Sequence, residues 1–323
     1  MTADARFMAA AVAIGRRGRG RTAPNPNVGA LIVSDGRIVG RGWCQPGGRP
    51  HAEAMALAEA GAKSRGATCY TTLEPCAHAS PRGPACSTLL VAAGVARVVG
   101  GMVDPDPRTA GAGYARLHDA GIAVTDGVLA DACAAAMEGF LTRQRLGRPH
   151  VTLKLAMSLD GRIALADGSS RWITGAAARA HAHLERARAE MIVVGRGTLA
   201  ADAPALDVRL DGLEGLSPRR AVLSRDPAPD GWEGLPAPGA IAALEQVDHL
   251  LVEGGAEAAA AFLAEDLVDR LLLYRAPILI GAGRAAVGDI GLTDLAAAHG
   301  RWRPGDARML GSDRIEVYER QRS

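Results

Sequence analysis

One histidine, one glutamate and two cysteines in the first third of the chain constrain its fold more than any other feature. Glu53 follows His51 by two positions, Cys76 comes 23 residues after Glu53, and Cys86 comes ten residues after Cys76. Zinc in proteins prefers a roughly tetrahedral set of nitrogen and sulfur ligands, and a catalytic zinc site keeps its fourth position for water. The histidine and the two cysteines therefore predict a zinc site with one open position.

Glu53 lies beside a ligand, where a carboxylate can take a proton from water and deliver it to a ring nitrogen and a leaving amine. Helices are predicted to begin at His51 and at Cys86, and helix N-termini favour anionic groups such as thiolates. The order H-x-E, then P-C, then C is typical of zinc deaminases. Nine residues separate Cys76 from Cys86 where two are usual, but a longer loop costs little free energy.

Taken singly, these residues have ordinary explanations, with His51 and Glu53 as exposed helix residues and the cysteines as small core residues. The ordered set, with a proline directly before both His51 and Cys76, favours zinc instead. His78, in the loop between the two cysteines, is a rival ligand, a substrate contact or an exposed residue, and the sequence leaves all three open. A fourth protein ligand would make the zinc structural rather than catalytic.

Helical and strand patterns alternate along both halves of the chain, which predicts two α/β domains. In the first half the patterns predict helices at 3–16, 51–61, 86–94, 109–121 and 131–146, a hairpin at 28–42, and strands at 67–75, 95–105 and 122–128. In the second half they predict strands at 150–158, 190–197, 219–224, 249–255, 269–281 and 313–321, helices at 176–189 and 256–266, and a loop at 225–240. Between the two halves, the glycine and proline of Gly147-Arg148-Pro149 interrupt regular secondary structure. We therefore expect domains at 1–147 and 148–323.

Composition narrows the function further. The net charge is +2 and the arginines are spread along the chain, whereas a nucleic-acid or membrane surface needs clustered basic charge. The five cysteines are an odd number and do not form a secreted disulfide framework, and Cys44 and Cys69 are expected in the core or in the wall of a site. No apolar run approaches the ~20 residues of a membrane span. We expect a cytoplasmic protein that binds a small molecule.

Four segments carry a family resemblance: PNPNVGALIV, HAEAMAL, TTLEPCAH, and KLAMSLDGRIA with the following RWITG. They resemble the bifunctional deaminase–reductase family of riboflavin biosynthesis, and the resemblance runs over nearly the whole chain. It implies an α/β fold in which an N-terminal cytidine-deaminase-like α/β/α sandwich precedes a dihydrofolate-reductase-like α/β domain. It also implies a hydrolase and an oxidoreductase in one chain, with Zn²⁺ and NADPH as cofactors.

The resemblance implies roles for individual residues. In the deaminase half it makes His51, Cys76 and Cys86 the zinc ligands, Glu53 the proton shuttle and Asn25 a contact of the pyrimidine. In the reductase half, the positions that line the active site or the cofactor are Ala156, Trp172, Thr174, Thr198, Asp202 and Gly255. The positions for the ribosyl phosphate substrate are Lys154, Ser170, Arg186, Leu206, Arg209 and Glu253.

The resemblance implies a pyrimidine ribosyl phosphate as the substrate, deaminated first and then reduced with NADPH, and a homo-oligomeric protein. The alternative is a zinc deaminase of a nucleoside or an RNA base, joined to a reductase-like domain that is inactive or differently specific. An RNA substrate would need a basic surface and stacking aromatic residues. The even charge and an aromatic content of 3% argue against that alternative.

Overall fold

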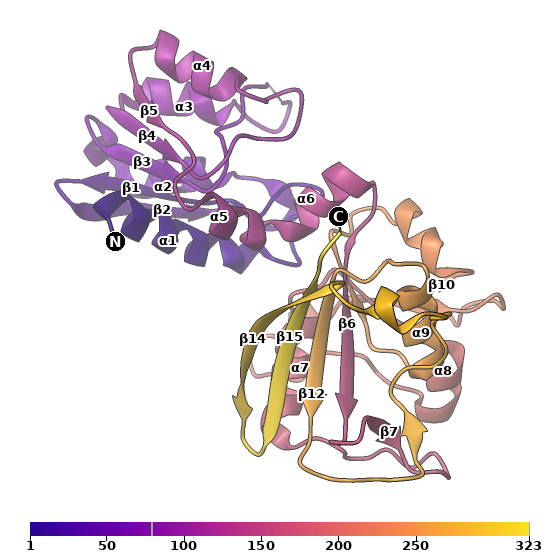
Figure 1. Cartoon of the computed structure of the whole chain (residues 1–323). Coiled ribbons are helices and arrows are strands. Elements are labelled where there is room, and N and C mark those ends of the chain that lie inside the picture. The colour runs from indigo at the N-terminus through magenta and orange to yellow at the C-terminus, as the bar shows by residue number, and fades with distance from the viewer. Residues whose placement is uncertain (79, 323) are drawn as a thin grey trace. The chain divides into compact units, whose positions relative to one another are not determined.

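The turn at Asp35-Gly36 closes the predicted hairpin, with φ of 50° and 71° at its two central residues. Two consecutive left-handed residues match the twist of an antiparallel pair, which explains why this dipeptide joins β1 (Gly29–Ser34) to β2 (Arg37–Trp43). The hairpin belongs to the first of two compact units, Met1–Gly147 and Arg148–Ser323, in this computed structural model. The structure describes residues 1–78 and 80–322 (Figure 1).

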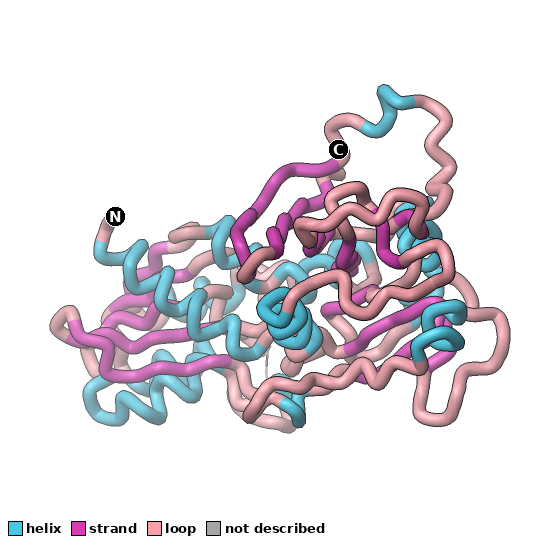
Figure 2. Tube along the Cα trace, turned by 90° about the horizontal axis from the view of Figure 1, so that it is seen from below, coloured by secondary structure: helices cyan, strands magenta, loops and turns pink. Residues whose placement is uncertain are grey.

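The first unit is built around a mixed five-stranded sheet with the order β2-β1-β3-β4-β5. The other strands are β3 (Thr68–Thr71), β4 (Arg97–Gly100) and β5 (Ala123–Thr125). β1 is antiparallel to β2 and β3, whereas β3, β4 and β5 are parallel to one another. Figure 2 shows these strands between helices, which is the predicted α/β/α sandwich.

Helices cover both faces of this sheet (Figure 1). α1 (Ala3–Gly15) and α5 (Ala130–Ala136) lie on one face, and α2 (Ala52–Ala60), α3 (Cys86–Ala93) and α4 (Ala112–Asp119) lie on the other. α6 (Glu138–Leu146) ends the unit at Gly147, which is left-handed. The core contains fully buried side chains from both faces and the strands between them, among them Met8, Leu31, Ile32, Leu90, Val98 and Leu117.

Glycines let α2 lie directly on β2. A Cβ on Gly42 would lie 1.9 Å from the carbonyl oxygen of Ala52, and one on Gly40 would lie 2.1 Å from that of Ala56. No side chain fits between the strand and the helix at these points, because real Cβ–oxygen contacts are far longer. The first turn of α2 is therefore fixed against the sheet, and with it the residue that precedes the helix, His51.

The second unit is built around an eight-stranded sheet with the order β10-β9-β8-β11-β6-β12-β15-β14. Its strands are β6 (His150–Met157), β8 (Met191–Gly195), β9 (Arg219–Leu223), β10 (Glu233–Leu235), β11 (His249–Val252), β12 (Arg270–Arg275), β14 (Trp302–Leu310) and β15 (Asp313–Arg320). The first six in the order are parallel, and β15 and β14 continue the sheet antiparallel. A separate pair, β7 (Arg162–Ala164) and β13 (Arg284–Ala285), lies outside it.

Helices also cover both faces of this second sheet. α7 (Ala176–Arg186) packs through Ala178 and Ala182 on Leu272 and Ile315, whereas α9 (Ala256–Ala264) inserts Phe262 among residues of the opposite face. α8 (Arg196–Asp202) follows β8 and has no buried residue. Among the described residues, no helix combines the length and apolarity that crossing a bilayer requires.

Several boundaries predicted from the sequence are wrong. The expected loop at 225–240 contains β10, the expected strand at 269–281 ends at Arg275, and the expected helix at 131–146 is divided into α5 and α6 near Met137. The residues from 109 to 111 precede α4 rather than belonging to it. α8 and β14 were not predicted, because most of their side chains are exposed and give no periodic pattern.

Candidate active site

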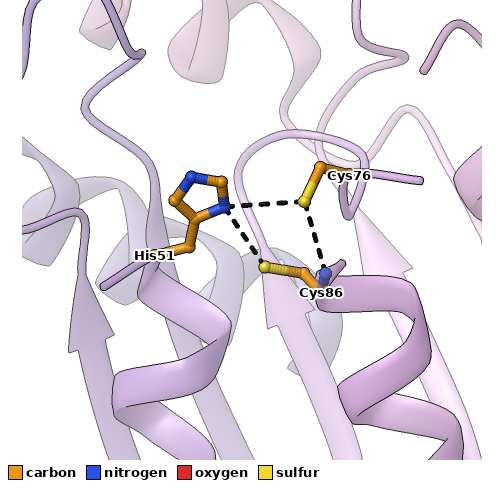
Figure 3. A group of neighbouring side chains, drawn as sticks. All are labelled: His51, Cys76 and Cys86. Carbon is orange, nitrogen blue, oxygen red and sulfur yellow. Dashed lines mark hydrogen bonds between the residues drawn. The ribbon is translucent and has the colours of Figure 1, made fainter. Parts of the chain in front are cut away.

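Three predicted ligands meet at the ends of three elements in the first unit. His51 directly precedes α2, Cys76 lies in the loop after β3, and Cys86 is the first residue of α3. His51 Nδ1 lies 3.6 Å from Cys76 Sγ and 3.4 Å from Cys86 Sγ, so the imidazole edge faces both sulfur atoms (Figure 3). The backbone N–H of Cys86 donates to Cys76 Sγ at 3.3 Å.

These distances fit a tetrahedral zinc site. Zinc bonds of about 2.3 Å to sulfur and about 2.0 Å to nitrogen at a tetrahedral angle place the two ligand atoms roughly 3.5 Å apart. The donor atoms of the three residues all lie within 4.8 Å of one another. Hydrogen bonds with Cys86 and His51 lower the pKa of the Cys76 thiol to about 4, against the opposing effect of burial. The ligand set is therefore spaced for zinc, and Cys76 favours the thiolate that zinc binds.

Glu53 lies in the first turn of α2 and is only 3% exposed. Its Oε1 accepts a long hydrogen bond of 3.4 Å from the hydroxyl of Thr71 on β3. Burial raises the pKa of Glu53, although His51 opposes the shift. A carboxylate in such an environment takes up a proton more readily than an exposed one, which is what a proton shuttle needs.

Asn25 lies on the opposite edge of the His51 ring. Its Nδ2 lies 3.2 Å from His51 Nε2 and donates to the carbonyl oxygen of Gly48 at the same distance. A Cβ on Gly48 would lie 2.5 Å from the Asn25 side chain, and Gly48 has φ of 85°, so only glycine suits this position. Asn25 is thus held next to a predicted ligand.

The loop between the two cysteines does not bring His78 to the ligand group. His78 Nδ1 lies 3.4 Å from the hydroxyl of Thr109, and within the described residues it does not belong to the group of possible ligands around His51. This placement removes the support for a fourth protein ligand from this loop. Cys44 and Cys69 are both buried outside the ligand group, as predicted.

A pocket of about 480 Å³ borders His51 and Cys86 and contains two arginines that sequence reasoning did not single out. Arg82, in the loop between the cysteines, donates to the carbonyl oxygen of Gly47 at 2.6 Å. Arg49 donates to the carbonyl oxygen of Pro84 at 3.4 Å. Their presence in the segments that flank the ligands was the only available sequence signal.

In the second unit, three of the predicted substrate residues form one buried charge cluster. Arg186, at the end of α7, binds Glu253 through two hydrogen bonds of 2.7 and 2.8 Å. Lys154 on β6 lies 3.5 Å from the same carboxylate. Burial alone would raise the pKa of Glu253, but Lys154 and Arg186 lower it to about 2. Two cations therefore share one anion and leave the cluster with a net positive charge.

Arg209 lies near this cluster but is exposed. Arg186 also donates to the carbonyl oxygen of Asp207 at 2.9 Å, and the side chain of Asp207 lies 3.3 Å from Arg209 Nε. His183 lies against the same segment, because its Nδ1 is 3.1 Å from the Asp207 carbonyl oxygen and 3.3 Å from the backbone nitrogen of Arg209, and the tautomer decides which of the two it binds. His183 and Asp207 were missed by the sequence analysis.

The predicted cofactor residues are found at the carboxyl ends of the parallel strands and in the loop before α7. The N–H of Gly255, which precedes α9, donates to the hydroxyl of Thr198 on α8 at 3.0 Å. Trp172 is 65% exposed, and its ring lies under the Arg179 guanidinium at 4.8 Å. The carbonyl oxygen of Asp202 accepts from Arg171, the neighbour of Trp172, at 3.2 Å.

The remaining residues predicted for the second unit are described by their position and burial. Ala156 shares a face of β6 with Lys154, because side chains two positions apart on a strand point the same way. Ser170 is half-buried in the loop before Trp172, and Thr174 is buried close to α7. Leu206 is 4% exposed and packs with Ile192 and Leu251, so it is a core residue in this structure, with its backbone in the left-handed region at φ of 54°.

Two family models match the chain, one for each unit. The model described as the cytidine and deoxycytidylate deaminase zinc-binding region matches residues 1–102. The model described as the RibD C-terminal domain matches residues 149–231 and 239–313. The chain therefore joins a zinc-binding deaminase domain to a reductase domain of the RibD type.

Curated relatives match over either most of the chain or a large part of it. The chain is 35% identical to the riboflavin biosynthesis protein RibD of Aquifex aeolicus over 98% of both chains. It is 50% identical to the protein of the same name from Escherichia coli over 65% of this chain and 57% of that one. RibD of Acinetobacter baumannii matches in structure with a TM-score of 0.89 at 35% identity, covering 99% of both chains. The chain belongs to the RibD family, whose members are bifunctional deaminase–reductases of riboflavin biosynthesis.

Proposed function

We propose that the chain catalyses two consecutive steps of riboflavin biosynthesis. The first is hydrolytic deamination of 2,5-diamino-6-ribosylamino-4(3H)-pyrimidinone 5′-phosphate by the unit Met1–Gly147. The second is NADPH-dependent reduction of the ribosyl group by the unit Arg148–Ser323, which gives 5-amino-6-ribitylamino-uracil 5′-phosphate. A structure from Thermotoga maritima described as a diaminohydroxyphosphoribosylaminopyrimidine deaminase/5-amino-6-(5-phosphoribosylamino)uracil reductase supports this substrate, with a TM-score of 0.88 at 31% identity.

The observation that carries the first step is the tetrahedral spacing of His51, Cys76 and Cys86 beside a buried glutamate. These three residues would hold zinc, which when bound lowers the pKa of a water molecule to near neutrality. Glu53 would accept one proton from the attacking water and pass it to the ring nitrogen, and would then move a second proton from the added hydroxyl to the amine, which leaves as ammonia. Asn25, held beside His51, offers its amide group to the polar edge of the pyrimidine.

The two arginines beside this site suit a phosphorylated substrate. Arg49 and Arg82 line the same pocket as His51, and among the described residues the guanidinium of each donates to one carbonyl oxygen, which leaves further N–H groups for a ligand. Guanidinium groups bind phosphate oxygens through charge-assisted hydrogen bonds. We assign both arginines to the 5′-phosphate. A nucleoside without a phosphate would leave the two arginines without this partner.

In the second unit, the residues proposed to hold the ribosyl phosphate are Lys154, Ser170, Arg186, Leu206, Arg209 and Glu253. The carboxylate of Glu253 is already paired with two cations. Its role would be to orient Lys154 and Arg186 rather than to contact an anionic group. Leu206 is a buried core residue, so it would support the site through packing rather than through contact of its side chain with the substrate. Arg209 is exposed in its ion pair with Asp207 and would approach the phosphate from the solvent side.

The residues proposed to bind NADPH are Ala156, Trp172, Thr174, Thr198, Asp202 and Gly255. Gly255 opens α9, and backbone N–H groups at a helix N-terminus receive phosphate groups. When bound, NADPH supplies the hydride, and the protein residues orient the sugar carbon towards it. The expected homo-oligomer and the cytoplasmic location stay predictions.

Zinc content and ammonia release test the proposal together. The purified full chain is analysed for metal and then assayed with the diaminopyrimidine ribosyl phosphate and, separately, with cytidine and its 5′-phosphate. We expect one zinc per chain, and ammonia from the diaminopyrimidine only. Ammonia from cytidine but not from the diaminopyrimidine would support the nucleoside deaminase instead. A chain that binds no zinc would refute the first step altogether.

A further inference from the structure

The helix α4 begins without a cap from its own flanking residues. Gly111 occupies the N-cap position with φ of 89°, and no side chain next to the helix accepts its first N–H groups. Such groups need an acceptor when they are buried. Here the acceptor is the carboxylate of Glu74, which is only 2% exposed and lies in the loop after β3. It accepts from four backbone N–H groups at 2.8 to 3.2 Å, those of Asp104, Gly111, Gly113 and Tyr114.

This contact joins α4 directly to the segment that carries Cys76. Glu74 precedes Cys76 by two residues, and the intervening Pro75 lies against the first turn of the helix. A Cβ on Gly113 would lie 2.0 Å from the carbonyl oxygen of Pro75, so the helix approaches this loop as closely as its backbone allows. A negative charge at a helix N-terminus is favourable, and hydrogen bonds to an ionised carboxylate are among the stronger ones.

A side chain of α4 itself holds the other side of Cys76. Arg116 donates to the carbonyl oxygen of Ala77 and to the hydroxyl of Ser87, both at 2.9 Å. The hydroxyl of Ser87 in turn donates to the carbonyl oxygen of Cys76 at 2.9 Å. Ser87 directly follows Cys86, so this chain of contacts reaches both sulfur ligands.

We propose that Glu74 is a positioning residue of the deaminase, which together with Arg116 fixes the sulfur atoms of Cys76 and Cys86 at their metal-binding distance. The proposal rests on the zinc site proposed above. An ordinary helix cap comes from a neighbouring residue and acts on one helix end only. Glu74 lies 37 residues before Gly111 in the chain and two before a ligand, so its loss releases α4 and the ligand loop together.

The variant Glu74→Gln tests this in the full chain. It keeps the length of the side chain but turns an amide NH₂ towards two of the four N–H groups, and it removes the charge. The control is Glu59→Gln, which removes one exposed carboxylate of the same unit, 45% exposed in its pair with Arg41. The zinc dissociation constant is measured by competition with a chromogenic chelator. Residues that support a metal ligand typically change affinity 10–100-fold, so we expect a rise of about that size in Glu74→Gln and none in the control.

Two further measurements separate positioning from mere stabilisation. The spectrum of the Co²⁺-substituted protein reports ligand geometry, and we expect its absorption bands to change in Glu74→Gln only. The melting temperature of the metal-free protein reports stability alone. A lowered melting temperature with unchanged zinc affinity and an unchanged Co²⁺ spectrum would make Glu74 a helix cap only and overturn the proposal.

A second variant covers the case in which Glu74→Gln does not fold. Arg116→Gln removes the contacts with Ala77 and Ser87 from an exposed position and leaves no buried charge behind. We expect a several-fold rise in the zinc dissociation constant, and wild-type affinity in this variant would overturn the proposal. If the wild-type chain itself bound no zinc, the proposed deaminase function would fail, which is a different result from wild-type binding with unaffected variants.

Discussion

Glu253→Gln is the substitution for which the structure gives the clearest magnitude. The carboxylate is 8% exposed and is the one anion shared by two neighbouring cations, Arg186 at 14% and Lys154 at 19% exposure. Replacing it with an amide of the same shape keeps the packing but leaves these cations without an anion. Removing one partner of a buried pair costs about 3–5 kcal/mol, because the remaining charge stays desolvated.

The pKa of Glu253 gives an independent figure. Despite burial, Lys154 and Arg186 lower it to about 2 from the ordinary value of 4.5. This difference of about 2.5 pH units corresponds to about 3 kcal/mol at about 1.4 kcal/mol per pH unit. A lowered pKa stabilises the fold above pH 4.5, and the stabilisation is lost as the pH falls towards 2. The variant should therefore lose about 3 kcal/mol near neutral pH and progressively less below pH 4.5.

Thermal unfolding followed by tryptophan fluorescence measures this loss. Three of the four tryptophans lie in the unit Arg148–Ser323, so the signal reports mainly on that unit. A loss of 3–5 kcal/mol lowers the melting temperature of a unit of this size by about 6–20 °C. The control is Glu245→Gln, which removes an exposed carboxylate of the same unit. Equal melting temperatures of Glu253→Gln and its control at neutral pH would refute the reasoning. So would a difference between the two melting temperatures that does not become smaller below pH 4.5.

Three further substitutions concern the deaminase unit. Cys86→Ala removes one of three ligands and should abolish stoichiometric zinc binding, measured by metal analysis, while reductase activity in the same chain persists; full zinc content would contradict the ligand assignment. Arg82→Ala should raise the KM for the phosphorylated substrate about 10-fold or more with little change in kcat, and an unchanged KM would remove this arginine from the phosphate site. Gly113→Ala places a Cβ 2.0 Å from the Pro75 carbonyl oxygen and should weaken zinc binding by pushing the ligand loop away; zinc affinity equal to wild type would show that the helix can move instead.

That His51, Cys76 and Cys86 come together could be predicted because residue type and order carry the chemistry of a zinc site. A histidine, two cysteines and a nearby glutamate have few common uses when they occur together, and each ligand stands where an element begins or ends. The elements with a buried run or a buried face were predicted for the same kind of reason. β1 and β6 bury most of their side chains, and α7 has a clear apolar face.

Elements without a buried face could not be predicted. In β14 only the first and last residues are partly buried, and Pro304 and Gly305 interrupt any strand-like composition. α8 has no buried residue at all. Hydrophobic periodicity in a sequence reflects burial, so a strand or helix without a buried face shows no such periodicity.

Contacts made by the backbone of distant segments were also beyond sequence reasoning. Glu74 binds N–H groups 30 to 40 residues further along the chain, and every residue except proline carries such a group. Likewise, Arg186 and Glu253 are 67 residues apart, and nothing in either local sequence identifies the partner. The family resemblance placed both in the substrate site, but only the structure shows that they bind each other.

The central claim is that one chain carries a zinc-dependent deaminase site and a separate reductase site, and Glu53→Gln tests it most directly. Ammonia release from the diaminopyrimidine ribosyl phosphate and NADPH oxidation with the deaminated product are measured on the same preparation, with zinc content determined in parallel. We predict full zinc content, ammonia release slowed by about 10²–10⁴-fold, and NADPH oxidation at the wild-type rate. Ammonia release at the wild-type rate, or loss of both activities with zinc retained, would contradict it.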